Sequence, residues 1–255
     1  MTRTLQFTKK WHKPLIVFTS IVLLFAIVGA LFLAGFIKIN TPSTERYPIR
    51  GVDVSEYQGT IDWVAIEKQG MSFAFIKATE GSSYTDAYFL DNWSAIETTT
   101  LICGAYHFFS FDSAANTQAE NFIKTVEAKP GMFPPVVDIE LYGQHKQNYP
   151  NIDLVRAELG IMLDLLETHY GVKPIIYATQ KSYSLFIRGY FPDYPLWIRD
   201  VYFTPNQTAD ESWAFWQYTD KGLLKGYSGE EKYIDINVFS GSYPELFNLQ
   251  VGEST

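Results

Sequence analysis

The sequence predicts an α/β fold: a single irregular β/α barrel of about eight strands, preceded by one transmembrane helix. Three observations lead to this prediction. A predominantly apolar run of 23 residues without a charge, residues 15–37, lies close to the N-terminus. After it, eight short apolar or β-branched runs recur, each typically closed by polar residues. Helix-like segments alternate with the first of these runs, which is the pattern of a β/α fold.

The apolar run is long enough to cross a membrane. At about 1.5 Å per residue it spans roughly 35 Å as a helix, against about 30 Å for the hydrocarbon core of a bilayer. Residues 1–14 hold four Lys or Arg and no acid, so the positive-inside rule predicts a cytoplasmic tail. A cleaved signal peptide shares this polarity, but its apolar core is usually only about 7 to 15 residues long. We therefore expect residues 15–37 to be an uncleaved, single-pass anchor in the lipid bilayer of the cell membrane, with the rest of the chain outside.

We expect residues 38–46, after the apolar run, to be a short tether. Its last part, residues 41–46, is polar and contains a proline. We expect one domain from there, residues 47–248. Residues 1–40 hold five of the 20 Lys and Arg and none of the 28 Asp and Glu, so the remainder has a formal net charge of −13. This charge argues against nucleic acid as a partner. The single cysteine, Cys103, lies in an apolar stretch and is expected to pack in the core.

The predicted strands and helices fill this domain unevenly. The strands cover residues 49–54, 72–78, 101–109, 135–140, 174–178, 196–199, 214–218 and 233–239. Helix-like segments lie between the early strands, at residues 61–68, 87–97, 114–127 and 154–170. The later spacers, residues 201–212 and 219–232, lack helical periodicity. We therefore expect loops or turns between the last three strands, and a barrel that is regular only in its first half.

Acidic residues lie at the ends of several predicted strands, where β/α barrels carry their functional groups. Asp53 ends the first strand, Glu80 follows the second, Asp138 and Glu140 close the fourth, and Asp235 lies in the eighth. In a strand, residues two apart face the same side with Cα atoms about 6 to 7 Å apart, so Asp138 and Glu140 share one face. Their mutual repulsion should raise the pKa of at least one of them, as a general acid requires near neutral pH.

A carboxyl pair of this kind suits the hydrolysis of glycosides, in which one member protonates the leaving oxygen and the other supports the positive charge. An isolated Asp-x-Glu also fits exposed acids at a strand end or a structural ion pair. Aromatic residues favour the saccharide interpretation, because ligand pockets present such rings to their ligands. Those at or just after predicted strand ends include Tyr57, Tyr106, Tyr177, Trp197, Trp216 and Tyr218.

Several separated motifs follow one another at the intervals of barrel strands. They are GVDVS at residues 51–55 with YQG at 57–59, FIKATEG at 75–81, GAYHF at 104–108, DIE at 138–140, WQY at 216–218 and DINVF at 235–239. In this order they resemble glycoside hydrolase family 25, the lysozymes of the Chalaropsis and Cellosyl type, over about residues 49–240. The resemblance implies a flattened β/α barrel. It also implies a muramidase, which cleaves the β-1,4 bond between N-acetylmuramic acid and N-acetylglucosamine in peptidoglycan glycan strands, without a metal or another cofactor.

The resemblance also implies roles for four acids. Glu140 corresponds to the acid that protonates the glycosidic oxygen, Asp138 to its partner carboxylate, and Asp53 and Asp235 to two acids at the floor of the site. A retaining, an inverting and a substrate-assisted mechanism all remain open, and in the last of these Asp138 would orient the acetamido group of the substrate. We expect the substrate to contact Tyr57, Glu80, Tyr106, Tyr177, Trp197, Trp216 and Tyr218.

Other classes of protein fit the sequence less well. A non-catalytic peptidoglycan-binding or scaffold protein on the same fold is the alternative, because fold does not imply function. A chitinase-like hydrolase would carry a longer D-x-x-D-x-D-x-E run, which is absent before Asp138. A metal-dependent deacetylase is disfavoured, because the four histidines lack the spacing of metal ligands. No cell-wall-binding repeat follows residue 240, so we expect the anchor to confine cutting to glycan close to the membrane.

Overall fold

The structure, a computed structural model, describes residues 12–33, 40–205 and 212–252. The chain divides into two units, residues 1–41 and 42–255. In the first unit, α1 (His12–Leu33) is 22 residues long and spans about 33 Å. The most apolar 18-residue window within Lys13–Leu33 has a mean hydropathy of 2.9, and none of it is buried in the protein. This helix is long and apolar enough to cross a membrane. The last part of the predicted anchor, residues 34–37, lies outside the described residues.

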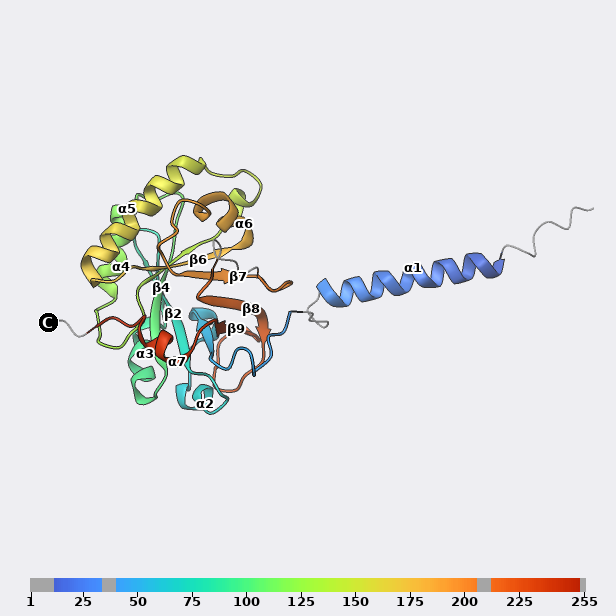
Figure 1. Ribbon diagram of the computed structural model, residues 1–255, viewed down its shortest axis with the longest axis horizontal. Coiled ribbons are helices and arrows are strands. Elements are labelled where there is room, and N and C mark those ends of the chain that lie inside the picture. The colour runs from blue at the N-terminus through green and yellow to red at the C-terminus, as the bar shows by residue number, and fades with distance from the viewer. Residues whose placement is uncertain (1–11, 34–39, 206–211, 253–255) are drawn as a thin grey trace, which may run out of the picture. The chain divides into compact units, whose positions relative to one another are not determined.

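In the second unit, eight of the described strands close a barrel (Figure 1). They are β1 (Arg50–Val54), β2 (Phe73–Glu80), β4 (Ile102–Phe108), β5 (Val136–Ile139), β6 (Ile175–Thr179), β7 (Leu196–Arg199), β8 (Phe215–Gly222) and β9 (Ile234–Phe239). Parallel pairing runs from β1 through β2 and β4 to β8. The strand β9 closes the barrel and is antiparallel to both of its neighbours, β8 and β1. All eight predicted strands are therefore present, and the predicted α/β barrel is confirmed. A short extra strand, β3 (Tyr84–Thr85), pairs with the end of β2 and was not predicted.

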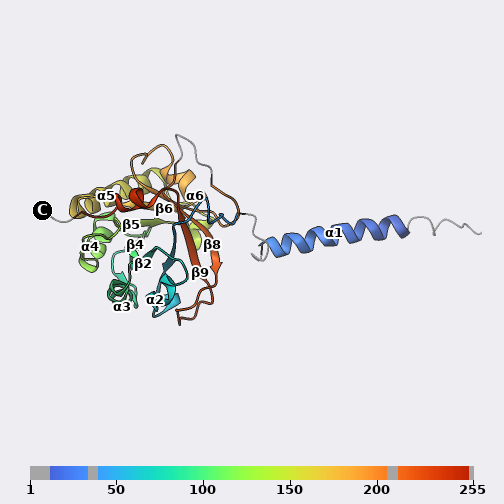
Figure 2. The same cartoon turned by 60° about the horizontal axis from the view of Figure 1, so that its bottom comes forward.

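The helices surround the first half of the barrel more completely than the second (Figure 2). The predicted ones are α2 (Trp63–Glu67), α3 (Phe89–Ala95), α4 (Ala115–Thr125) and α5 (Ile152–Tyr170). The last of these starts after an Asn151 cap and ends at Gly171, whose positive φ of 69° favours glycine. Additional short helices are η1 (Glu56–Gln58), η2 (Ile96–Thr98), η3 (Gly143–Lys146), α6 (Gln180–Ser182), η4 (Tyr183–Ile187) and α7 (Tyr243–Phe247). As predicted, no helix lies between β8 and β9, whereas the expected loop at residues 201–212 is described only in part.

The interior of the barrel is filled by aromatic side chains. Phe75 stacks on Trp197 with ring centroids 4.4 Å apart, and Phe73 and Phe215 meet edge to face at 5.2 Å. Glycine makes room for these rings, because a Cβ atom on Gly104 would lie 2.7 Å from the Phe75 ring. The interior is therefore a packed core, and polar side chains gather where the strands β1 to β8 end.

A second apolar cluster lies between the outer face of the barrel and the helices. Along each strand, every second side chain points away from the barrel interior and into this outer cluster. Cys103, which was predicted to lie in the core, is half-buried against the same cluster. The segment before β1 packs there too, since Tyr47 contacts Trp213 with ring centroids 5.7 Å apart. Arg50 donates a 2.7 Å hydrogen bond to the carbonyl oxygen of Pro42. The barrel unit thus begins at Pro42, within the segment predicted as a tether.

Candidate active site

Two carboxyl groups meet at the floor of the site. Asp53 near the end of β1 is directly opposite Asp235 near the start of β9. Because β9 is antiparallel, its N-terminal end reaches the same edge of the barrel as the C-terminal end of β1. The two carboxyls hydrogen-bond to each other, which requires a shared proton. Burial raises the pKa of Asp53, and burial followed by the charge of Asp53 raises the pKa of Asp235 well above its usual range.

Two buried amides determine which of these acids is charged. Gln217 Nε2 lies 2.9 and 3.0 Å from the two carboxyl oxygens of Asp53 and 3.0 Å from Asp235 Oδ2. Asn237 Nδ2 donates to Asp53 Oδ1 at 2.7 Å. These donors stabilise the Asp53 carboxylate, so Asp53 carries the negative charge and Asp235 the proton. Neither amide was assigned a role from the sequence, although both lie in the quoted motifs and one or two residues from an expected site residue.

Aromatic side chains hold the two amides in place. Tyr177 donates its hydroxyl proton to Gln217 Oε1 at 2.9 Å, and Trp197 Nε1 donates to Asn237 Oδ1 at 2.8 Å. Because these bonds occupy the amide oxygens, both amides present their NH₂ groups to Asp53. Tyr177 and Trp197, which were predicted to bind substrate, therefore also support the floor of the site.

The predicted carboxyl pair lies across the barrel from the floor acids. Asp138 is in β5, and Glu140 follows directly after that strand. Asp138 is 8 % exposed, and its Oδ1 atom has no hydrogen-bond partner among the described residues. Burial and, secondarily, the charge of Glu140 raise the pKa of Asp138 well above its usual range, while Lys77 acts in the opposite direction. The member of the pair with the clearly raised pKa is thus Asp138, while Glu140 is the more exposed of the two.

Cationic side chains lie between these acids. Lys77 lines the cleft and pairs at 2.7 Å with Glu80, which itself does not line it. Arg199, at the end of β7, pairs at 2.8 Å with Asp220. Lys77 and Arg199 were not predicted as site residues, because the sequence signal at the strand ends comes from acidic and aromatic residues. Glu80 holds Lys77 in position but does not itself line the cleft. Its location therefore does not support the predicted contact with substrate.

The four acids open into one cleft of about 500 Å³ at the C-terminal ends of the parallel strands. Four of the predicted aromatic residues line it, namely Tyr57, Tyr106, Tyr177 and Trp197. The other two do not: Trp216 and Tyr218 point outward from β8 into the outer cluster, where Trp216 donates to the Asp200 carbonyl oxygen at 2.9 Å. Side chains alternate along a strand, so Gln217 between them faces the cleft instead. We therefore remove these two from the candidate site.

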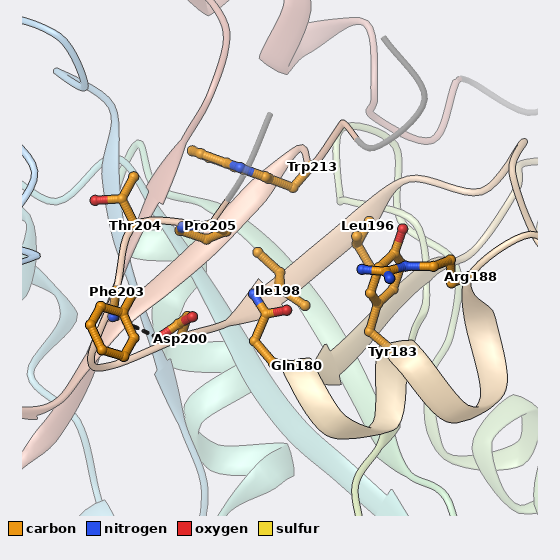
Figure 3. Close-up of a pocket in the computed structure, with 10 residues that line it drawn as sticks. All are labelled: Gln180, Tyr183, Arg188, Leu196, Ile198, Asp200, Phe203, Thr204, Pro205 and Trp213. Carbon is orange, nitrogen blue, oxygen red and sulfur yellow. Dashed lines mark hydrogen bonds between the residues drawn. The ribbon is translucent and has the colours of Figure 1, made fainter. Parts of the chain in front are cut away.

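A separate hollow of about 270 Å³ lies on the outer face of β7 (Figure 3). Leu196 and Ile198 of β7 and Tyr183 of η4 contribute to its walls. Since neighbouring residues point to opposite faces, this hollow is on the other side of β7 from Trp197 and Arg199. None of the predicted site residues lines it. Within residues 12–33, 40–205 and 212–252, no three His, Cys, Asp or Glu side chains are grouped so that they could hold a metal ion.

Comparison with known proteins places the barrel in a family. The sequence profile described as "Glycosyl hydrolases family 25" matches residues 52–227. The chain is 38 % identical over 205 residues to the protein YegX of Escherichia coli K12, covering 78 % of this chain and 72 % of that one. It is 30 % identical over 214 residues to Lysozyme M1 of Streptomyces globisporus, covering 79 % and 71 %.

A solved structure agrees with these matches. A family 25 glycosyl hydrolase from Bacillus anthracis superposes with a TM-score of 0.77 at 50 % sequence identity, covering 82 % of this chain and 96 % of that one. The family profile alone spans more than half of the chain, and the fold agrees with it. The chain therefore belongs to glycosyl hydrolase family 25.

Proposed function

We propose that the cleft hydrolyses the β-1,4 bond between N-acetylmuramic acid and N-acetylglucosamine in peptidoglycan, with Glu140 as the proton donor. As a member of family 25 with lysozymes among its relatives, the chain is a glycoside hydrolase of the lysozyme type. The observation that supports the site best is the convergence of Asp53, Asp138, Glu140 and Asp235 on one aromatic-lined cleft at the functional end of the barrel. A non-catalytic scaffold would have no need for four buried or half-buried carboxyl groups, which are costly to desolvate.

The carboxyl pair can divide the work of glycoside cleavage. Burial and the charge of Glu140 raise the pKa of Asp138, so burial favours the protonated form of Asp138 in the free protein. The acetamido N–H of a bound sugar can donate to Asp138 Oδ1, which has no other partner among the described residues. That bond stabilises the Asp138 carboxylate and leaves the proton on Glu140, beside the leaving oxygen. Asp138 then stabilises the positive charge that develops at the anomeric carbon.

The other cleft residues hold the sugar and the charges in place. The Asp53 carboxylate, fixed by Gln217 and Asn237, supplies negative charge to the floor below the anomeric centre. Tyr57 is 61 % exposed, so its ring is available for stacking on a sugar face. Lys77 and Arg199 limit the mutual repulsion of the acids around them.

The test of this function is the identity of the new reducing end. The full-length protein in detergent is incubated with purified peptidoglycan, and the products are reduced and hydrolysed. Reduced muramic acid is the expected result. Reduced glucosamine would identify a glucosaminidase instead, and the absence of any new reducing end would support the scaffold alternative.

We further propose that residues 15–37 are an uncleaved anchor, with residues 1–14 in the cytoplasm and the barrel outside the cell membrane. The proposal is supported by the length and hydropathy of α1 and by the basic residues that precede it. Protease added to intact cells whose wall has been removed is expected to digest the barrel and leave the anchor. A protected barrel, or a mature protein that starts near residue 31, would contradict this topology.

A further inference from the structure

Glu140 lies just beyond the part of β5 that pairs with its neighbours. The pairing of β4 with β5 ends at Asp138, and the pairing of β5 with β6 ends at Ile139. The ladder of the barrel therefore fixes the backbone of Asp138 but does not include Glu140. The position of the Glu140 carboxyl group depends instead on how the residues that follow it are held.

Tyr142, two residues farther along the chain, is fastened by its hydroxyl group to the loop between β4 and α4. The amide of Phe111 donates to Tyr142 Oη at 2.9 Å, and Ser110 Oγ lies 3.2 Å from the same atom. Tyr142 Oη donates in turn to Asp112 Oδ2 at a longer distance of 3.4 Å. Three consecutive residues of the β4–α4 loop thus surround this one hydroxyl group.

The ring of Tyr142 is also held by aromatic contacts. It stacks on Phe111, with ring centroids 5.3 Å apart and an angle of 7° between the planes. Its centroid is 5.5 Å from that of Phe108, a residue that lines the cleft. His145 packs edge-on against both Tyr142 and Phe111, and its Nε2 atom lies 3.5 Å from Asp112 Oδ1. Ring pairs of this geometry add stabilisation beyond the area that they bury, so the two loops form one fixed unit.

This attachment restricts the backbone of the proton donor. Only Leu141 separates Glu140 from Tyr142, so the Cα atoms of Glu140 and Tyr142 are at most about 7 Å apart. Glu140 and Leu141 line the cleft, whereas Tyr142 does not. Proton transfer requires a heavy-atom distance of about 2.6–3.2 Å, and a displacement of about 1 Å can cost on the order of 10²-fold in rate. A small movement of this turn would therefore affect donation of the proton more than binding of the glycan.

We propose that Tyr142 is the positioning residue of Glu140: it fastens the turn after β5 to the β4–α4 loop and so holds the Glu140 carboxyl group beside the scissile oxygen. This inference rests on the proposed role of Glu140 as the proton donor, and it adds the contact that fixes the place of the donor. Tyr142 acts through Glu140 and does not touch the substrate itself.

The experiment separates proton donation from the other steps by changing the leaving group. Full-length Tyr142→Phe loses the hydroxyl group but keeps the ring, and Tyr142→Leu loses both. On the soluble tetrasaccharide GlcNAc-MurNAc-GlcNAc-MurNAc, we expect kcat to fall about tenfold for Tyr142→Phe and further for Tyr142→Leu, with KM within about twofold of wild type. A dinitrophenyl glycoside of GlcNAc-MurNAc needs little protonation of its leaving group, so single-turnover rates on it should stay within about threefold of wild type.

The matched control is Tyr170→Phe, which removes another hydroxyl group that binds a neighbouring loop. Tyr170 Oη donates to the Val126 carbonyl oxygen at 2.6 Å, away from the cleft. This variant should lower the Tm, as Tyr142→Phe does, but leave the rates on both substrates unchanged. A merely structural role of Tyr142 would give the same pattern as this control, or an equal loss on both substrates.

Glu140→Gln is the reference for complete loss of the donor. If Glu140→Gln loses as much activity on the dinitrophenyl glycoside as on the tetrasaccharide, the proposed role of Glu140 is wrong. If Glu140→Gln depends on the leaving group and Tyr142→Phe does not, the positioning role of Tyr142 is wrong. A raised KM for the tetrasaccharide with unchanged kcat would likewise overturn it, because it would place Tyr142 in substrate binding.

Discussion

Asp53 and Asp235 lie opposite each other across the antiparallel pair of β1 and β9, where their carboxyl groups share a proton. This relationship joins residues 182 positions apart, at the seam where the barrel closes. Since a fixed charge at this floor faces the reacting sugar, we expect Asp53→Asn and Asp235→Asn each to lower kcat on peptidoglycan by about tenfold or more.

The fold should survive both substitutions. The pKa of each acid is raised by burial, so ionisation of this pair opposes folding above the usual pKa of Asp, and an amide removes that cost. Thermal unfolding followed by circular dichroism at pH 7 should show an unchanged or higher Tm for each variant. Wild-type rates for both variants would mean that the floor acids are not part of the site.

The charge on Asp53 depends on the amide of Asn237. Removing the 2.7 Å hydrogen bond with Asn237→Ala destabilises the carboxylate and raises the pKa of Asp53 further. The acidic limb of the kcat/KM profile against pH should therefore move to higher pH. Trp197→Phe removes the partner that orients the Asn237 amide, so it should shift the limb in the same direction by a smaller amount. An unshifted limb in Asn237→Ala would show that Asp53 does not act as a carboxylate.

Gly104 permits the close packing of the barrel interior. A Cβ atom there would lie 2.7 Å from the Phe75 ring and 3.0 Å from Phe133, in a core without free space. Gly104→Ala should therefore lower the free energy of unfolding by about 1–3 kcal/mol. Gly160→Ala is the matched control within α5, where the nearest atom to a new Cβ is 3.8 Å away. Because alanine favours helix over glycine, that variant should be stabilised by about 0.5–1 kcal/mol, as denaturant unfolding would measure.

His107 is buried on the outer face of β4 and is neutral. Burial lowers its pKa to about 4, and it lies 2.7 Å from Thr79 Oγ1 and 3.1 Å from Gln118 Oε1. The Gln118 oxygen can only accept, so His107 Nε2 donates and Nδ1 accepts from Thr79. Between pH 6.5 and pH 4 the unfolded chain binds a proton that the folded chain excludes. Stability should therefore fall as the pH is lowered through this window, by about 3 kcal/mol in total.

The comparison of wild type with His107→Gln isolates this contribution. Raised pKa values of the site acids act in the opposite direction over the same window, but both proteins share them. The difference in the free energy of unfolding between the two proteins should shrink or reverse in favour of the variant as the pH falls. A difference independent of pH would show that His107 accepts a proton in the folded state.

Local pattern was sufficient to predict the eight barrel strands and the helices α2, α3, α4 and α5. It did not predict β3 or the polar segment Gln180–Ser182, whose helical turn depends on a cap from the Thr179 side chain. Such short elements form because the barrel around them is already folded.

The candidate site was predictable where an acid ends a parallel strand, as for Asp53 and Asp138. The roles of Trp216 and Gln217 were not, because both faces of β8 are buried and the sequence there is apolar or aromatic without clear alternation. Which residue faces inward is set by pairing with β9, whose Asn237 lies opposite Gln217. That register is a long-range property.

The roles of Glu140 and Asp138 are separable by the acidity of the leaving group. Glu140→Gln keeps the size of the side chain but cannot donate a proton of useful acidity, so activity on natural glycan should fall by about 10² to 10⁴-fold. An aryl glycoside with an activated leaving group needs little protonation, so this variant should keep much more of its cleavage activity there. Asp138→Asn should be impaired on both substrates, because positive charge develops at the anomeric carbon whatever the leaving group.

Single-turnover kinetics on the aryl glycoside, with enzyme in excess, measure the cleavage step directly. The raised pKa of Asp138 makes this experiment decisive, because burial alone would favour Asp138 as the protonated member of the pair. If Asp138 is the donor, then Asp138→Asn is rescued by the better leaving group and Glu140→Gln is not. Rescue of Glu140→Gln alone supports a proton that moves to Glu140 when the acetamido group of the substrate binds Asp138.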